Sequence, residues 1–123
     1  MNNVGSSGIK HIRWEEVPVE SVNPLLDRQM VVGDKVMVAR LVLRQGSIVP
    51  MHHHHNEQVS HVLSGALLFT LEDGEITVRA GEFLCIPPHA PHAARALEDT
   101  VAIDVFTPPR QDWLDKDDQY LRG

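Results

Sequence analysis

Short apolar runs separated by turn residues recur along the chain, and this pattern predicts strands rather than helices. The run 35–44 is rich in β-branched residues and carries apolar side chains on both faces, which predicts a strand buried on two sides. Asp73-Gly74 lies between two alternating runs and predicts a hairpin. The whole pattern predicts about nine or ten short strands, which is typical of a sandwich, jelly roll or small barrel.

The remaining elements are predicted from the same signals. Strands are expected at 9–17, 48–55, 57–65, 66–92 (three short ones), 92–97 and 100–109. The stretch 22–34 holds turn signals, and the charged segment after Pro109 predicts a short helical turn. Residues 1–8 are small and polar, so we expect a flexible tail followed by one domain over 9–123.

Composition narrows the class of protein. The chain has 123 residues, 42% of them hydrophobic, which suits one globular domain. A net charge of −6 argues against a nucleic-acid partner. No apolar run approaches the roughly 20 residues of a membrane helix, and no signal-peptide core is visible at the start. The single Cys85 excludes an internal disulfide and fits a reducing compartment, so we expect a cytoplasmic location with no membrane partner.

Histidine carries the candidate chemistry. The chain has 8 histidines, four of them consecutive at 52–55. On a strand His52 and His54 share one face, and two imidazoles at this spacing can hold one metal ion, while His53 and His55 share the opposite face. A solvated polar loop is the alternative interpretation. No role is assigned to His53, His55, His61 or His89.

Two spaced motifs in this region resemble those of the cupin superfamily. The first is matched by Gly46, His52, His54, Gln58 and Gly65, and the second by Gly81, Pro87 and His92. Gln58 stands where Glu is usual, His89 where Gly is expected, and Ala96 where Asn is expected. The resemblance implies an all-β cupin double-stranded β-helix, that is, a jelly-roll barrel.

The resemblance also implies a divalent transition metal ion held by His52, His54, Gln58 and His92. A neutral amide leaves the ion its full charge, so the site is a stronger Lewis acid and binds the metal less tightly. Strand alternation turns Glu57 away from the side of Gln58. Imidazole and oxygen ligands do not choose among zinc, nickel, iron, manganese and copper.

A longer set of matches over 46–114 resembles the KdgF-like cupins, in which Gln at the fourth ligand position is the rule. These matches include FTLEDGE, IPPHAPH and DVFTPPRQDWL. The family linearises 4,5-unsaturated monouronates from pectin or alginate breakdown, giving 5-keto acids. The resemblance implies catalytic roles for Asp104 and Arg110 and substrate contacts by Phe106 and Arg110. It also implies a small carboxylate or sugar-acid substrate and a homodimer paired through outer sheets.

The residues themselves leave alternatives open. Asp104 and Phe106 share one strand face, and either this face or the Val/Ile face could fill the interior. Arg110 is either a fork for a carboxylate or an ordinary surface charge. A cupin dioxygenase acting on a small organic substrate, and a non-enzymatic cupin that binds a metal or ligand, are the alternative functions.

Overall fold

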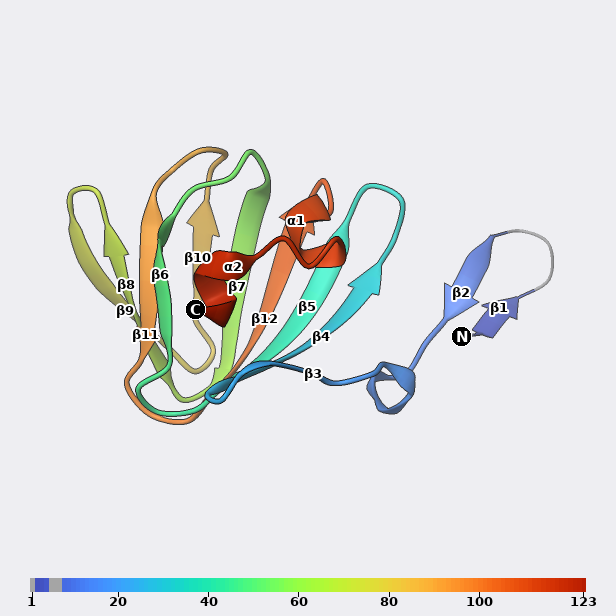
Figure 1. Cartoon of the computed structure of the whole chain (residues 1–123), viewed down its shortest axis with the longest axis horizontal. Coiled ribbons are helices and arrows are strands. Elements are labelled where there is room, and N and C mark those ends of the chain that lie inside the picture. The colour runs from blue at the N-terminus through green and yellow to red at the C-terminus, as the bar shows by residue number, and fades with distance from the viewer. Residues whose placement is uncertain (1, 5–7) are drawn as a thin grey trace.

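Two antiparallel sheets face each other in the computed structural model, which describes residues 2–4 and 8–123 (Figure 1). The six-stranded sheet has the order β10 (Phe83–Ile86), β7 (Glu57–Ser64), β12 (Thr100–Thr107), β5 (Met37–Leu43), β4 (Leu26–Val32) and β3 (Glu20–Asn23). The four-stranded sheet has the order β6 (Ile48–His52), β11 (His92–Ala96), β8 (Ala66–Leu71) and β9 (Gly74–Arg79). This arrangement is the jelly roll that the sequence predicts.

Smaller elements flank the two sheets. Strands β1 (Asn2–Val4) and β2 (Ile9–His11) pair with each other and extend away from the sheets in Figure 1. A 3₁₀ turn, η1 (Trp14–Glu16), precedes β3. Two short helices, α1 (Gln111–Leu114) and α2 (Gln119–Arg122), follow β12. No helix in the described part of the chain is long and apolar enough to cross a membrane.

The core lies between the sheets and follows from strand alternation. In β5, Met37, Ala39, Leu41 and Leu43 are buried, while the side chains between them are half-buried on the outer face. Within one chain, the prediction that 35–44 is buried on both sides therefore holds for the inner face, whereas the outer face is only half-buried. β12 lies between β5 and β7, so its inward side chains are enclosed from both neighbouring strands.

The structure explains why the first motif has a glycine at position 65. Gly65 connects β7 to β8 with a positive φ of 87°, a conformation that side chains with a Cβ rarely adopt. A Cβ at this position would also collide with the Asp99 carbonyl oxygen and with Thr100. Gly65 thus allows the close approach between this turn and the start of β12.

Two regions differ from the expected elements. The range 9–17 is not one strand, because it divides into β2 and the 3₁₀ turn η1. The stretch 22–34 contains β4, in which charged Arg28 and polar Gln29 are buried and so mask the apolar alternation. The predicted tail over 1–8 lies partly outside the described residues and stays a prediction; within it, Asn2–Val4 form β1.

Candidate metal centre

Three histidines from separate segments meet between the sheets. His52 ends β6, His92 begins β11, and the two are register partners in the four-stranded sheet. His54 follows in the loop before β7, where its carbonyl oxygen accepts a hydrogen bond from the His89 backbone N–H at 2.7 Å. One ring nitrogen of each of the three side chains lies within 4.8 Å of the others. This cluster could hold a metal ion.

Hydrogen bonds to the backbone orient all three rings in the same way. Nδ1 of His52 lies 2.7 Å from the Pro50 carbonyl oxygen, Nδ1 of His54 lies 3.0 Å from that of Asn56, and Nδ1 of His92 lies 2.8 Å from that of Ala90. A carbonyl only accepts, so each Nδ1 carries the proton and each Nε2 keeps a free lone pair. His92 Nε2 is buried and has no hydrogen-bond partner among the described residues. Histidines that bind a metal through one ring nitrogen usually donate a hydrogen bond from the other nitrogen, as these three do from Nδ1.

The environment keeps these rings neutral. Burial lowers the pKa of both His52 and His54 to about 4, helped by the positive charge of Arg110. Burial also lowers the pKa of His92. Neutral imidazole is the form that binds a metal, so the three side chains are ready ligands near pH 7.

Gln58 supplies a fourth donor beside the histidines. Its Nε2 donates to Ser60 Oγ at 2.9 Å, which fixes the amide so that Oε1 lies 3.1 Å from His54 Nε2. Both facing atoms are acceptors, because the proton of His54 is on Nδ1. Two lone pairs directed at one space suit a cation there. Three imidazole nitrogens and one amide oxygen fit a divalent transition metal ion, in the set that the cupin resemblance implies.

The other histidines lie elsewhere. His53, His55 and His89 are exposed, and Glu57 is exposed on the opposite side of β7 from Gln58. His61 stacks on Phe83 with ring centroids 4.1 Å apart, away from the cluster on the outer face of the six-stranded sheet. None of these side chains belongs to the histidine cluster.

Asp104 points inward from β12 rather than to solvent. Its side chain is buried, and Gln58 Nε2 lies 3.5 Å from Oδ2. Burial raises the pKa of Asp104 to about 6, although a hydrogen bond with Ser60 and the charge of Arg110 act in the opposite direction. A carboxyl group with this pKa can both accept and donate a proton near neutral pH.

Arg110 is buried just beyond β12 and is not a surface charge. Its Nε and Nη2 donate to the two carboxylate oxygens of Asp112 at 3.0 and 2.8 Å. The guanidinium carbon lies 5.1 Å from the centre of the Phe106 ring and 4.6 Å from that of Trp113. Asn56 ties this region to the His54 loop, because its side chain donates to the carbonyl oxygen of Pro108 at 2.6 Å.

A cavity brings the expected residues together. It is lined, among others, by His52, Gln58, His92, Asp104, Phe106 and Arg110. Sequence reasoning missed four side chains at or beside this cavity: Arg28, Ser60, Asp112 and Tyr120. Ser60 alone had a visible signal, since it lies two residues after Gln58 on the same strand face.

Comparisons with known proteins agree with this geometry. The Cupin_2 family, described as Cupin domain, matches residues 39–106, which is more than half of the chain. A crystal structure of an RmlC-like cupin from Shewanella frigidimarina is 28% identical with a TM-score of 0.76, over 80% of this chain and 90% of that one. The structure of KdgF from a Halomonas species is 28% identical with a TM-score of 0.75, over 80% of this chain and 94% of that one.

Curated sequences give the same result. The pectin degradation protein KdgF of Dickeya dadantii is 25% identical over 81% of this chain and 94% of its own length. An uncharacterized protein of Methanocaldococcus jannaschii is 31% identical over 58% of each chain. Fold and site together define a small jelly-roll protein with a candidate metal centre between its sheets. The chain belongs to the Cupin_2 family, and its predicted resemblance to KdgF-like cupins is confirmed.

Proposed function

We propose that the protein is a metal-dependent enzyme that linearises 4,5-unsaturated monouronates to 5-keto acids. One observation carries the proposal. The cavity that is lined by Gln58 and by two of the three clustered histidines, His52 and His92, is also lined by a buried carboxyl group with a pKa of about 6 and by a buried arginine. The similarity to two proteins named KdgF, one of them a pectin degradation protein, supports this substrate class.

The reaction requires one proton to leave and one to return. The substrate is a cyclic hemiacetal whose ring oxygen belongs to an enol ether at C4 and C5. Removal of the anomeric hydroxyl proton forms the C1 aldehyde and breaks the bond from C1 to the ring oxygen, which leaves an enolate at C5. Protonation at C4 then gives the C5 ketone, so the product is an isomer of the substrate and no redox partner is needed.

Each residue takes a role that its environment favours. Asp104 accepts the hydroxyl proton and returns one to C4, because its pKa near 6 allows both steps. Arg110 holds the substrate carboxylate, and Phe106 forms an apolar wall of the cavity. A metal ion bound by His52, His54, Gln58 and His92 would supply Lewis-acid stabilisation of negative charge on oxygen.

Proton NMR tests this proposal directly. Metal-loaded protein is mixed with enzymatically generated 4,5-unsaturated monouronate, and loss of the vinylic C4 proton signal is followed against buffer. Loss should be fast with the native chain and with Asp73→Asn, a control in an exposed turn. It should fall to the buffer rate with Asp104→Asn and with metal-stripped protein.

The same assay can also reject the proposed reaction. If the native chain, with a metal bound at the three histidines, lost the vinylic signal no faster than buffer, the uronate reaction would be rejected. An oxygen-uptake screen with the metal varied would then test the dioxygenase alternative, and the absence of any turnover would favour a binding function.

We also propose that two copies pair through the outer face of the six-stranded sheet. Val42, Val101, Ile103 and Val105 are half-buried there, and Phe83 is 59% exposed beside them. Arg40 and His61 lie on either side of Ile103 on the neighbouring strands, so the apolar surface is interrupted there. Covering the remaining apolar side chains with a second copy would remove their surface from water. The expected cytoplasmic location stays a prediction.

A further inference from the structure

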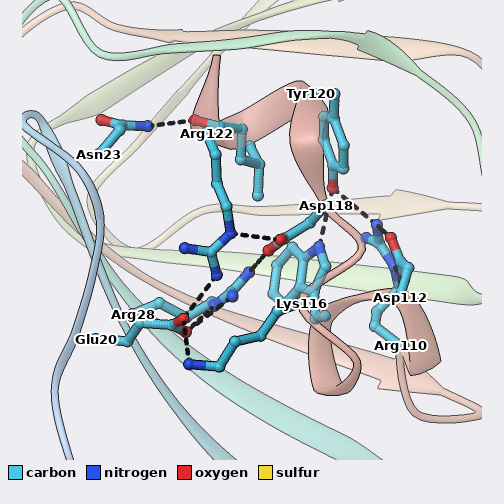
Figure 2. A network of polar contacts seen from close by, with 11 residues as sticks. Glu20, Asn23, Arg28, Arg110, Asp112, Lys116, Asp118, Tyr120 and Arg122 are labelled. Carbon is cyan, nitrogen blue, oxygen red and sulfur yellow. Dashed lines mark hydrogen bonds and ion pairs between the residues drawn. The ribbon is translucent and has the colours of Figure 1, made fainter.

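The C-terminal helix bridges the two sheets at the candidate site. α2 contacts β3 of the six-stranded sheet and β6 of the four-stranded sheet. The Tyr120 ring lies 4.8 Å from the ring of His52, measured between centroids. The Tyr120 hydroxyl accepts hydrogen bonds from Arg110 Nη2 at 2.8 Å and from Trp113 Nε1 at 2.9 Å (Figure 2). Tyr120 therefore joins a candidate metal ligand to the arginine assigned to the substrate.

Tyr120 takes up a hydrogen-bond donor of Arg110 that a substrate carboxylate would need. Asp112 takes one edge of the guanidinium, formed by Nε and one hydrogen of Nη2. The second hydrogen of Nη2 points to Tyr120. A carboxylate that binds Arg110 with two parallel bonds must use the edge formed by the two Nη nitrogens, since Asp112 holds the other. The Tyr120 hydroxyl thus occupies the position of one substrate carboxylate oxygen.

The cavity is also too small while α2 is in place. Its volume is about 50 Å³, and Tyr120 and Leu121 form part of its lining. Pockets that enclose small-molecule ligands measure on the order of 300–1,000 Å³. A cyclic monouronate therefore needs a larger cavity, and a movement of α2 would enlarge it because two of its side chains form part of the lining.

A cluster of charges holds α2 in this position. Asp118, which is fully buried, accepts a hydrogen bond from Arg122 Nε at 2.7 Å, and its Oδ2 lies 2.8 Å from Arg28 Nη1 without hydrogen-bond angles. Glu20 binds Arg28 at 2.9 Å and Arg122 at 2.6 Å (Figure 2). Lys116 adds a weaker contact to Glu20 at 3.4 Å. Ion pairs thus tie both ends of α2 to β3 and β4. The helix is also held by Asn23 Nδ2, which donates to the Leu121 carbonyl oxygen at 2.8 Å, and by the Leu121 side chain, which lies in the core.

We propose that residues 118–122 form a lid and that Tyr120 is its gating residue, which competes with the substrate carboxylate for Arg110. This inference rests on the proposed role of Arg110 in holding that carboxylate. Binding exchanges the Tyr120 hydroxyl for carboxylate oxygens, so the lid admits ligands that replace its contact with Arg110. It discriminates against neutral sugars, which lack the charge to do so.

Calorimetric titration of Zn²⁺-loaded protein tests the competition with two probes, formate and galacturonate. Formate is small enough for the closed cavity, so Tyr120→Phe should bind it about tenfold more tightly than the native chain, the effect of one removed hydrogen-bond competitor. The gain should vanish in a Tyr120→Phe/Arg110→Gln double variant. A purely structural tyrosine would show no gain.

A second variant tests the ion pairs that hold α2, at a residue that does not line the cavity. Asp118→Asn should tighten galacturonate binding severalfold, while Asp115→Asn, an exposed change at the end of α1 and outside the lid, should leave it unchanged. Melting temperatures show that each variant is folded. Formate and galacturonate affinities equal to or below those of the native chain in both Tyr120→Phe and Asp118→Asn would overturn the lid.

The two proposals fail in different ways. Native turnover in the NMR assay with no affinity gain in either variant would reject the lid and leave the uronate reaction in place. Affinity gains without turnover would reject the reaction and support the lid as a gate for another carboxylate. If no variant binds either carboxylate, the lid fails together with the role of Arg110.

Discussion

Oε1 of Gln58 and Nε2 of His54 face each other at 3.1 Å, and neither atom carries a proton. The backbone carbonyl of Asn56 holds the His54 proton on Nδ1, and Ser60 holds the amide of Gln58 in place. Two lone pairs that face each other at this distance favour a positive charge between or beside them. Replacing Gln58 therefore changes the site in a way that can be predicted.

Gln58→Glu should bind a divalent metal more tightly and turn over more slowly. A negative ligand attracts the ion more strongly, by about tenfold or more in affinity, and it weakens the ion as a Lewis acid. It also places a second carboxylate beside Asp104, which raises the pKa of Asp104 further. Competition with a chromogenic chelator measures the affinity, with Gln45→Glu in an exposed turn as control. Weaker binding than the native chain would contradict this assignment of Gln58.

Metal-free protein should lose stability as the pH falls from about 6.5 toward 4. Free histidines in the unfolded chain bind protons from pH 6.5 downward, whereas folded His52 and His54 have pKa values of about 4. The unfolded state then binds more protons, so the free energy of unfolding falls with pH. Urea unfolding at a series of pH values measures this slope.

Asp104 acts against that slope over part of the range. Its folded pKa of about 6 lies above the ordinary 3.8, so the folded state holds an extra proton between these values. Removing this opposing group in Asp104→Asn should make the acid loss of stability steeper between pH 6 and 4. An unchanged slope would show that the carboxyl is not buried as described.

Gly65→Ala should destabilise the fold by about 3 kcal/mol, from the positive φ together with the collision at Asp99 and Thr100. Gly81→Ala is the matched control, because Gly81 has a similar φ of 85° with nothing within 4 Å of an added Cβ. The control should lose only about 1 kcal/mol. Equal losses in urea unfolding would remove the packing argument for Gly65.

Ile103→Lys should convert the proposed dimer to a monomer, since it places a charge in the middle of the outer apolar face. Ile76→Lys on β9 of the other sheet, where the side chain is 44% exposed, should leave the dimer intact. Light scattering after size-exclusion chromatography measures the mass. A native chain that elutes as a monomer at micromolar concentration would reject the dimer.

The sequence by itself determined the class of fold and the spacing of the candidate ligands. Alternating short runs with Gly and Pro turns are local signals, so β5 to β12 lie close to their predicted ranges. His52, Gln58 and His92 could be singled out because the cupin motifs have fixed spacings along the chain. The sequence pattern did not predict strand β4, because Arg28 and Gln29 are buried by partners distant in sequence, which no local pattern reveals.

Only the tertiary structure decided which face and which partners the other residues have. Alternation puts Asp104 and Phe106 on one face, but the pairing of β12 with β5 and β7 makes that face the interior. From the sequence alone, Arg110 could be a surface charge. In the folded chain it is buried and hydrogen-bonded to Asp112 and Tyr120. Tyr120 lies 68 positions from His52 along the chain, and hydrogen bonds and ion pairs formed on folding bring the two rings together. Such contacts depend on where segments meet in space, and that is physical information that spacing along a chain does not contain.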